Sequence, residues 1–544
     1  MNTARLTLAC ATELLQKHGL LREVICGEMW SLVPEPQIAN TQVQHIIYDS
    51  REIIPGTMLF IKGRFRPEFL RDADSRGLTA YVAEKDYSYA TKAPGLIVHD
   101  VRKAMSLLAA AFYGHPERDL AMIGITGTKG KTTTAYFTQA LLNAYSVGKA
   151  ALFSSVDNCL DGHTYEESDL TTPESLDAFR MMRTAVDNGM RYLVMEVSSQ
   201  AYKVHRVHGI TFDIGAFLNI SPDHISDIEH PTFEDYLYSK RRLIANSRTL
   251  ILGADSTHID LLTQDAKQHH TPTTTFALRT SAVESPVGAS TDAPSVVAYP
   301  ATEADGYVIS NREPDGSVTT MGPITLDIEG DFNYANAAAA IAIGIQAGVD
   351  FSSSAGKEAL RVMQRVRVPG RMEQFTDPVS SALAIVDYAH NRLSVNALLD
   401  FVEKRYSSRN PHIILVTGSA GNKALERREQ IVSAAQDRID RFIFTAEDTD
   451  SEPYLDICKD MARHVSNTSV KSDIIVDRTQ AVEAAVEDAR EHRDRFTIIL
   501  IIGKGDERWI KDANQHTAYE GDDRLIQRLF SYTPVPQTLS DALS

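Results

Sequence analysis

A short apolar strand, a glycine-rich turn and a helix follow one another directly between residues 121 and 145. The turn reads Gly-Thr-Lys-Gly-Lys-Thr over residues 127–132. Glycines let the backbone approach a ligand closely, and the N–H groups at the start of a helix attract anions. Lys131 can reach the terminal phosphates of a nucleotide, and the hydroxyl of Thr132 can hold a magnesium ion. This order restricts the middle of the chain to an α/β fold with a phosphate site at one edge of its sheet.

Apolar segments continue to alternate with segments of helix length after this turn. Residues 191–199, 213–220 and 249–255 are predicted strands, and their order predicts a mostly parallel sheet with helices on both faces. Residues 265–320 are instead rich in Thr, Ser, Ala, Pro and Asp. We favour a surface insertion or meander there, with a candidate hairpin around residues 314–316.

The length of 544 residues predicts about three domains, because a domain typically has roughly 100–200 residues. Residues 1–117 alternate short strands with turns and are predicted to form a small N-terminal α/β domain. Residues 118–368 form the central domain, with a parallel sheet like that of the P-loop ATPases. Beyond residue 369, strands again alternate with helices, which predicts a C-terminal, Rossmann-like domain over residues 369–544.

Composition argues against several classes of protein. Lys and Arg number 55 against 72 Asp and Glu, and the formal charge of −17 argues against nucleic acid as a partner. No run of 18 apolar residues predicts a membrane span, and residues 1–24 suggest an amphipathic helix rather than a signal peptide. The four scattered cysteines lack metal-binding spacing and are expected to be reduced. We therefore expect a cytoplasmic protein, and a monomer.

The segment T-G-T-K-G-K-T at residues 126–132 resembles the phosphate loop of the Mur ligase superfamily, which also includes the folylpolyglutamate synthetases. The segments at residues 330–340, 368–373 and 386–391 resemble further ATP-binding segments of that family. The resemblance implies that ATP is bound by the central domain and covered by the C-terminal one when the domains close. The implied ATP-binding residues are Gly127, Thr128, Lys129, Gly130, Lys131, Thr132, Thr133, Asn333, Asn336, Arg371 and Asp387.

Metal ligands are implied at the ends of two predicted strands. Glu196 ends one strand and His224 follows another, at the sheet edge where α/β proteins bind ligands. Magnesium takes carboxylate oxygens readily and histidine only sometimes. The resemblance implies two magnesium ions held by Thr132, Glu196, His224 and a carbamate that CO₂ forms on Lys240. Without the family, Lys240 would be interpreted as a solvated surface lysine. The implied catalytic set is Lys131, Glu196, His224 and Lys240.

Three further segments resemble the tripeptide synthetases of this family, which add the third residue of the peptidoglycan stem peptide. These segments cover residues 48–56, 170–177 and 196–206. The third of these segments ends at Arg206. The family usually has a glutamine two residues before this arginine, but this chain has Val204 there. The resemblance implies a UDP-N-acetylmuramoyl dipeptide as substrate, contacted by Ser50, Arg51, Thr171, Thr172, Ser198 and Arg206. Ser50 and Arg51 can equally be surface residues without a role.

The segment at residues 445–453 replaces the D-N-P-R segment of the enzymes that add diaminopimelate. Arginine suits the distal carboxylate of that amino acid, but Asp450 stands in its place here. The later segment at residues 503–508 adds further acids. We predict L-lysine as the third residue, with ornithine as a shorter competitor and a solvated acidic loop as the alternative interpretation. The predicted pocket comprises Arg428, Glu447, Asp448, Asp450, Asp506 and Glu507.

The sequence therefore predicts an ATP-dependent ligase that forms an amide through an acyl phosphate in peptidoglycan synthesis. Another ligase of the superfamily, such as a folylpolyglutamate synthetase, is one alternative. A non-catalytic homologue that still binds a nucleotide is another. The joint presence of the four residues implied in catalysis favours an active enzyme.

Overall fold

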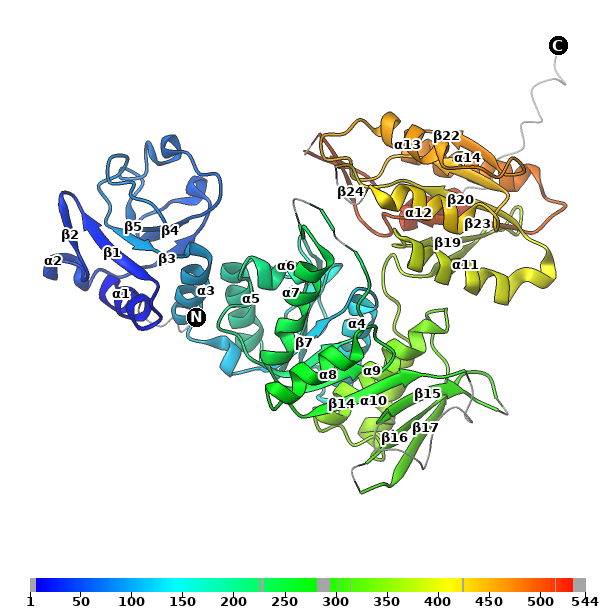
Figure 1. Ribbon diagram of the computed structural model, residues 1–544, viewed down its shortest axis with the longest axis horizontal. Coiled ribbons are helices and arrows are strands. Elements are labelled where there is room, and N and C mark those ends of the chain that lie inside the picture. The colour runs from blue at the N-terminus through cyan, green and yellow to red at the C-terminus, as the bar shows by residue number, and fades with distance from the viewer. Residues whose placement is uncertain are drawn as a thin grey trace, which may run out of the picture.

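The computed structural model describes residues 6–223, 225–226, 229–280, 294–302, 304–313, 315–422, 425–513 and 515–531. Within these residues the chain forms three α/β lobes, and Figure 1 shows the central lobe between the other two. The main sheets of the lobes lie within residues 21–98, 121–324 and 373–502. The alternation of strands and helices read from the sequence is confirmed, and the fold is α/β.

The N-terminal sheet has the strand order β2-β1-β6-β5-β4-β3. Strands β3 to β6 are parallel, whereas β1 runs antiparallel to both of its neighbours. The helices α1 and α3 pack on one face of this sheet, where Leu15 and Leu108 join Phe60 in the core. The elements are α1 Leu8–Lys17, β1 Leu21–Cys26, β2 Met29–Ser31, α2 Pro36–Ala39, β3 His45–Ile47, β4 Thr57–Ile61, β5 Leu78–Ala83, β6 Gly95–Val98 and α3 Val101–Phe112.

The central sheet has the strand order β10-β9-β8-β11-β7-β12-β13-β14-β15-β16-β17. Its middle strands, from β8 to β15, are parallel, so the predicted parallel sheet is confirmed. The strands are β7 Ala121–Thr126, β8 Ala150–Phe153, β9 Asp157–Cys159, β10 Tyr165–Glu167, β11 Tyr192–Glu196, β12 Phe212–Phe217, β13 Ser247–Gly253, β14 Thr273–Leu278, β15 Val296–Pro300, β16 Tyr307–Arg312 and β17 Val318–Ile324.

Helices cover both faces of this sheet, as its apolar strands require. Successive residues of β7 belong to different cores: Met122 packs with Phe179 of α5, and Ile123 packs with Phe137 of α4. A parallel strand that is buried on both faces has this continuous apolar character. The helices are α4 Lys131–Tyr145, α5 Ser175–Asp187, α6 Ser199–Lys203, α7 Phe233–Ala245, α8 Ile259–Gln268, α9 Phe332–Gln346 and α10 Ser354–Gln364.

The segment at residues 265–320 differs in part from the sequence-based interpretation. The hairpin is confirmed, because β16 and β17 pair antiparallel, and β15 pairs with β16 as in a meander. The segment is not a separate surface insertion, however. Strand β14 pairs parallel with β13, and β15 pairs parallel with β14, so the segment extends the central sheet. Its polar and weakly periodic sequence hid these strands, although each has a neighbour on both sides and β15 is mostly buried.

The C-terminal sheet has the strand order β18-β19-β23-β20-β21-β22 and is parallel apart from β18. A separate hairpin, β24–β25, follows it. Among the described residues, no helix combines the length and apolar character needed to cross a membrane. The elements are β18 Glu373–Thr376, β19 Leu383–Asp387, α11 Arg392–Tyr406, β20 His412–Thr417, α12 Glu426–Ala435, β21 Arg441–Phe444, α13 Tyr454–Arg463, β22 Lys471–Ile474, α14 Arg478–Glu491, β23 Thr497–Ile502, β24 Trp509–Asp512, β25 Gln515–Ala518 and α15 Asp522–Ser531.

Candidate active site

A cleft of about 630 Å³ is lined by both the central and the C-terminal lobes. The loops that follow β7, β19, β21 and β23 all contribute to it. Parallel strands present their carboxyl ends at one edge of a sheet, which brings residues from distant parts of the chain together. The predicted site residues in its lining are Thr128, Lys129, Gly130, Lys131, Thr132, Thr133, Thr171, Glu196, Asn336, Arg371, Asp387, Glu447, Asp448, Asp506 and Glu507.

The loop between β7 and α4 is packed tightly against α9. Gly130 has a φ of +83°, and a Cβ atom on it would lie 2.3 Å from Oδ1 of Asn336. Glycine alone fits this position, because a side chain would be both strained and too close. Asn336 is oriented in turn by its Nδ2 group, which donates a hydrogen bond to Oδ1 of Asn333 at 2.9 Å. Asn333 thus orients the side chain of Asn336 and does not itself line the cleft.

The ammonium of Lys131 folds back onto its own loop. Its Nζ donates hydrogen bonds to the carbonyl oxygens of Gly127 at 3.0 Å and Thr128 at 3.2 Å. Burial lowers the pKa of Lys131 below its usual value. Phosphate oxygens form stronger, charge-assisted hydrogen bonds than neutral carbonyl groups do. A nucleotide in the loop would therefore attract this ammonium away from the carbonyl oxygens.

Glu196 ends β11 with a fully buried side chain. Its Oε1 atom accepts a hydrogen bond from the backbone N–H of Ser155 at 2.8 Å. Its Oε2 atom is buried and has no hydrogen-bond partner among the described residues. The hydroxyl of Thr132 lies 3.0 Å from the hydroxyl of the same Ser155. A buried acceptor without a partner is costly, so Oε2 is an open position for a ligand such as a cation.

Lys240 projects from α7 toward the phosphate loop and is 2% exposed. Its Nζ donates a hydrogen bond to the carbonyl oxygen of Gly127 at 2.8 Å and lies 3.4 Å from Oγ1 of Thr126. Burial, followed by the nearby charge of Lys131, lowers the pKa of Lys240 well below its usual value. These positions rule out the interpretation of Lys240 as a solvated surface lysine.

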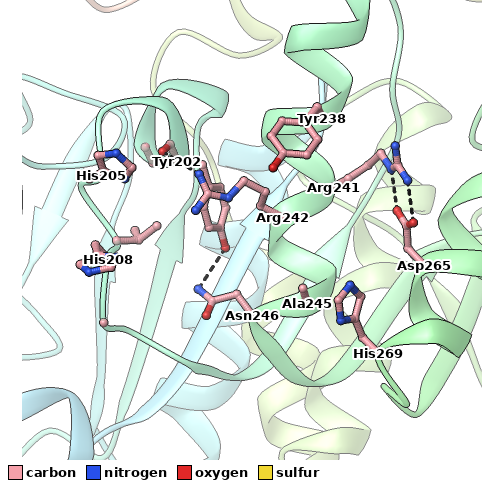
Figure 2. Close-up of a pocket in the computed structure, with 13 residues that line it drawn as sticks. Tyr202, His205, His208, Tyr238, Arg241, Arg242, Ala245, Asn246, Asp265 and His269 are labelled. Atoms are coloured by element: carbon pink, nitrogen blue, oxygen red, sulfur yellow. Dashed lines mark hydrogen bonds and ion pairs between the residues drawn. The ribbon is translucent and has the colours of Figure 1, made fainter. Parts of the chain in front are cut away.

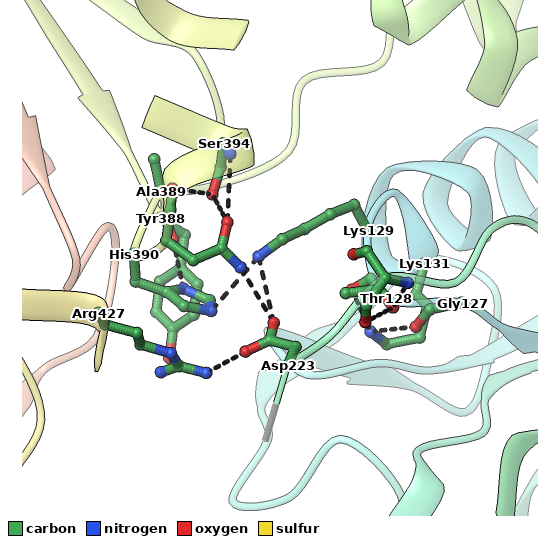
Figure 3. A network of polar contacts seen from close by, with 12 residues as sticks. Gly127, Thr128, Lys129, Lys131, Asp223, Tyr388, Ala389, His390, Ser394 and Arg427 are labelled. Carbon is green, nitrogen blue, oxygen red and sulfur yellow. Dashed lines mark hydrogen bonds and ion pairs between the residues drawn. The ribbon is translucent and has the colours of Figure 1, made fainter. Parts of the chain in front are cut away.

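Asp223 is the centre of a polar network that joins the central and C-terminal lobes. Its carboxylate forms an ion pair with Arg427 and accepts a hydrogen bond from Nδ2 of Asn391 at 3.0 Å. Figure 3 shows Lys129 extending from the phosphate loop to the same carboxylate, with Nζ 3.7 Å away. The Nζ of Lys129 also lies 3.4 Å from Nε2 of His390. Burial lowers the pKa of His390 well below its usual value, so its neutral ring can accept a hydrogen bond there.

Arg371 and Asp387 lie on the C-terminal side of the cleft. The guanidinium of Arg371 lies 4.5 Å from the centre of the Tyr388 ring. The carboxylate of Asp387 accepts hydrogen bonds from the backbone N–H groups of Met372 at 2.9 Å and Ala389 at 2.8 Å. These bonds fix the turn after β19 and connect it to the backbone next to Arg371.

Glu447, Asp448, Asp506 and Glu507 form an acidic group in the same cleft. The buried Lys504 offsets part of this charge, because its Nζ lies 2.9 Å from Oδ1 of Asp448 and forms an ion pair with Glu507. Burial and then the charge of Asp448 raise the pKa of Glu447 to about 7. Arg371 and Arg427 line the same cleft and act on Asp506 and Glu447, so four carboxyl groups face three cations. Because Arg427 is already paired with Asp223, an excess of negative charge remains, which favours a cationic ligand.

The structure does not bring two predicted pocket residues to the cleft. Asp450 has a φ of +54°, and its carboxylate lies 2.5 Å from Nζ of Lys511. Arg428 is 4% exposed and forms ion pairs with Glu452 at 2.6 Å and Asp460 at 3.1 Å. Both charges are therefore already paired within the C-terminal lobe, and neither residue lines the cleft.

The chain is similar to known proteins along most of its length. Residues 125–344 match the Mur ligase middle domain, and residues 370–505 match the Mur ligase glutamate ligase domain. The chain is also 60% identical over 526 residues to a UDP-N-acetylmuramyl-tripeptide synthetase of Bifidobacterium longum, covering 96% of this chain and 99% of that one. The chain belongs to the Mur ligase family.

Two further comparisons describe how this Mur ligase relates to others. It is 36% identical over 524 residues to the UDP-N-acetylmuramoyl-L-alanyl-D-glutamate–L-lysine ligase of Enterococcus faecalis, covering 96% of this chain and 98% of that one. A solved UDP-N-acetylmuramoyl-L-alanyl-D-glutamate–2,6-diaminopimelate ligase has the same fold, with a TM-score of 0.57 and 20% identity. That likeness covers 92% of this chain and 96% of the other.

Thr172 and Ser198 of this Mur ligase lie directly behind Glu196. The hydroxyl of Thr172 donates a hydrogen bond to the carbonyl oxygen of Glu196 at 2.8 Å and accepts one from the N–H of Ser198 at 3.0 Å. Thr172 is fully buried, whereas its neighbour Thr171 lines the cleft. The pair formed by Thr172 and Ser198 therefore fixes the end of β11 rather than facing the cavity.

Arg206 is held by a bridge between the N-terminal and central lobes. Its guanidinium lies 2.8 Å from Oε1 of Glu174, and Nζ of Lys62 lies 2.6 Å from Oε2 of the same carboxylate. Lys62 and Glu174 were not predicted from the sequence. Glu174 lies in the segment at residues 170–177 that resembles the tripeptide synthetases, two positions after Thr172, and this was the signal that could have found it.

Ser50 and Arg51 lie in the N-terminal lobe and do not line the cleft. The Arg51 side chain is 88% exposed and forms an ion pair with Asp49 at 2.5 Å. His224 lies outside the described residues. Asp223, Arg427 and Lys504 were also not predicted from the sequence, because each contacts a residue more than 50 positions away along the chain and carries no local pattern.

A second cavity, of about 440 Å³, lies between α6, α7 and α8. Figure 2 shows its polar lining, in which Arg241 pairs with Asp265 and Asn246 donates a hydrogen bond to the hydroxyl of Tyr202. None of the predicted site residues lines this cavity. The large cleft between the lobes is therefore the candidate active site.

Proposed function

We propose that this protein is an ATP-dependent ligase that joins an amino acid to UDP-N-acetylmuramoyl-L-alanyl-D-glutamate in peptidoglycan synthesis. The names of the relatives at 60% and 36% identity support this activity. The observation that carries the proposal is one cleft that contains both a phosphate loop and an acidic group from another lobe. Such a cleft can hold ATP close to an amino acid with a cationic side chain.

Each domain has its own task in this proposal. Residues 1–117 bind the UDP group, with Ser50 and Arg51 as candidate contacts. Residues 118–368 bind ATP and magnesium, and residues 369–544 bind the amino acid. ATP and a nucleotide-linked precursor are cytoplasmic compounds, which favours the cytoplasm as the place of reaction. The proposal takes the protein to be a monomer.

ATP fits the loop at residues 127–133, where backbone N–H groups and Lys131 can meet the phosphates. Asn336 supports the loop, and Arg371 and Asp387 would contact the ribose and phosphates from the other side of the cleft. Lys129 already reaches across to Asp223, so the loop is connected to the network that joins the lobes. Closing of the lobes would exclude water from the phosphates.

Two magnesium ions are part of the proposal. The free Oε2 atom of Glu196 fits a hard cation, since carboxylate oxygens are the ligands that magnesium prefers. Thr132, His224 and a carbamate on Lys240 complete the proposed ligand set. When bound, the ions would neutralise the charge that develops on the transferred phosphoryl group.

The surroundings of Lys240 support the carbamate. A neutral amine can attack CO₂, forming an N–C bond and releasing one proton from the nitrogen. Burial lowers the pKa of Lys240 well below its usual value, which favours the neutral amine. The product would carry a carboxylate-like group next to the loop that holds ATP.

The proposed reaction has two chemical steps. The substrate carboxylate first takes the terminal phosphoryl group of ATP, which gives an acyl phosphate and ADP. The neutral amine of the amino acid then attacks the acyl carbon and expels phosphate, which leaves an amide. Lys131 would stabilise the negative charge on the phosphoryl oxygens, and no covalent bond to the protein is needed.

The acidic group favours L-lysine as the amino acid. The four carboxyl groups of Glu447, Asp448, Asp506 and Glu507 outnumber the three cations around them, so an ammonium group fits better than a second carboxylate. Ornithine shares the charge but is shorter by one methylene. A folylpolyglutamate synthetase activity is not favoured, because the relatives that match nearly the whole chain at 36–60% identity carry the tripeptide synthetase or L-lysine ligase name.

Product analysis tests the activity itself. The protein would be incubated with ATP, magnesium, UDP-N-acetylmuramoyl-L-alanyl-D-glutamate and L-lysine, and the products measured by mass spectrometry. We expect the UDP-linked product to gain the mass of one lysyl residue, with ADP and phosphate formed in equal amounts. A non-catalytic homologue would bind ATP and leave the UDP-linked compound unchanged.

A further inference from the structure

Two histidines and an aspartate meet on the C-terminal lobe, away from the cleft. His412 is the first residue of β20, Asp488 lies in the last turn of α14, and His492 caps that helix. Oδ1 of Asp488 lies 3.1 Å from Nε2 of His412 and 2.9 Å from Nδ1 of His492. One ligand atom of each residue lies within 4.8 Å of those of the other two.

These distances are close to those of a zinc site. Tetrahedral zinc with bonds of about 2.0–2.2 Å separates its nitrogen and oxygen ligands by about 3.3 Å. Shifts of a few tenths of an ångström in the two hydrogen-bonded pairs, together with a closer approach of the two ring nitrogens, which lie within 4.8 Å of each other, would reach that separation. Imidazole nitrogens with one carboxylate suit zinc, whereas magnesium prefers oxygen ligands and octahedral geometry. The His492 side chain is 47% exposed, which leaves a fourth position open to water.

The surroundings orient two of these three side chains. The other ring nitrogen of His412 lies 3.6 Å from Oδ2 of Asp440, and a carboxylate in this position fixes a metal-binding imidazole. The second oxygen of Asp488 forms an ion pair with Arg441, which leaves Oδ1 to face the histidines. The group also lies at the C-terminal end of a helix, where the helix dipole favours a cation.

We propose that His412, Asp488 and His492 bind a zinc ion. The ion would join the start of β20 to the end of α14. His412 lies 76 residues before Asp488 and 80 residues before His492 in the chain. The cleft residues follow the carboxyl ends of the strands, whereas His412 begins its strand. The zinc site therefore lies at the opposite edge of the sheet, where it would stabilise the C-terminal lobe without entering the reaction.

The competing interpretation is a cluster in which Asp488 accepts hydrogen bonds from both histidines at Oδ1, and from Nδ1 of His492 also at its backbone carbonyl oxygen, 2.9 Å away. The two interpretations differ in what they require of the ring nitrogens. Zinc needs both facing nitrogens deprotonated, and the hydrogen-bonded cluster needs both protonated. Only the first interpretation predicts saturable binding of a metal.

Calorimetric titration of the full-length protein with zinc chloride, in excess magnesium, tests the proposal. We expect the wild type to bind one zinc ion more than His492→Ala, whose exposed side chain can be removed without disturbing the core. His163→Ala is the matched control, since His163 is also exposed and lies 3.3 Å from an aspartate carboxylate, but stands outside the cluster. It should bind as much zinc as the wild type.

Two further readouts separate a metal site from a structural effect. Asp440→Asn should weaken zinc binding roughly 10- to 100-fold, because it removes the carboxylate behind His412. Cobalt substituted for zinc should give the intense visible absorption of four-coordinate cobalt, and His492→Ala should lose it. Equal zinc binding by the wild type and His492→Ala, or the weak absorption of six-coordinate cobalt in the wild type, would overturn the proposal.

Discussion

The Nζ atom of Lys240 lies 2.8 Å from the carbonyl oxygen of Gly127, 113 residues earlier in the chain. This hydrogen bond attaches α7 to the start of the phosphate loop. It places a buried amine, with a pKa well below its usual value, beside the position proposed for the ATP phosphates. The contact gives the proposed carbamate a location and leads to the first prediction.

Lys240→Ala should reduce kcat by about 100-fold or more, because it removes a group that stabilises charge in the reaction. Added bicarbonate should not restore activity, since no amine remains to react with CO₂. Lys267→Ala, on the exposed face of α8, serves as the control. Phosphate release measures both variants, and near wild-type turnover of Lys240→Ala would refute the carbamate.

Glu196→Gln should raise the magnesium concentration needed for half-maximal activity by about tenfold or more. The amide oxygen can still accept the hydrogen bond from the Ser155 N–H, so the fold should persist. The neutral side chain offers magnesium a weaker ligand than the free Oε2 atom of the carboxylate does. Magnesium titrations of phosphate release provide the measurement. An unchanged magnesium requirement would exclude Glu196 as a ligand.

Glu447→Gln should raise the KM for L-lysine by about tenfold and leave the KM for ATP unchanged. Asp450→Asn is the matched control, because Asp450 is paired with Lys511 and does not line the cleft. Its KM values should stay close to those of the wild type. The reverse order, with Asp450→Asn the more damaging change, would show that the acidic group is misassigned.

The raised pKa of Glu447 gives the same site a pH dependence. The carboxyl group is neutral below its pKa of about 7 and negatively charged above it. The KM for L-lysine should therefore fall as the pH rises through about 7, and Glu447→Gln should remove this change. Initial rates measured across that range test the sign. A KM that rises with pH in the wild type would be the opposite of what we expect.

Arg427→Met should weaken the network that joins the two lobes, because it removes the ion pair with Asp223. We expect a larger radius of gyration in solution scattering and a kcat lower by roughly tenfold, since loss of alignment between reacting groups is costly. Arg438→Met, which breaks ion pairs within the C-terminal lobe, should change neither. Identical scattering and kcat for Arg427→Met and the wild type would contradict a closing role.

Much of the fold could be predicted from the sequence, because apolar strands and helices alternate in a regular order. The phosphate loop could also be predicted, because Gly130 and Lys131 belong to a local sequence pattern between a strand and a helix. Glu196 could be placed at a strand end by its position alone. These features depend on residues that are close together in the chain.

Features that depend on distant pairs could not be predicted. The resemblance predicted Asp450 as a residue of the amino-acid pocket, but Lys511 of the β24 strand takes up its charge. Asp223 carries no local signal, because Asn391 and Arg427 reach it from another lobe. Strands β14 and β15 have neighbours on both sides in the sheet, but they were missed because their segment is rich in Thr, Ser and Pro and weakly periodic.

The rate of phosphate release with different amino acids tests the central claim most directly. The assay contains ATP, magnesium, UDP-N-acetylmuramoyl-L-alanyl-D-glutamate and, in turn, L-lysine, L-ornithine or meso-diaminopimelate. We predict the highest kcat/KM for L-lysine, exceeding that for diaminopimelate by roughly 100-fold or more, because the acidic group repels a distal carboxylate. A preference for diaminopimelate, or no release with any amino acid, would contradict the account.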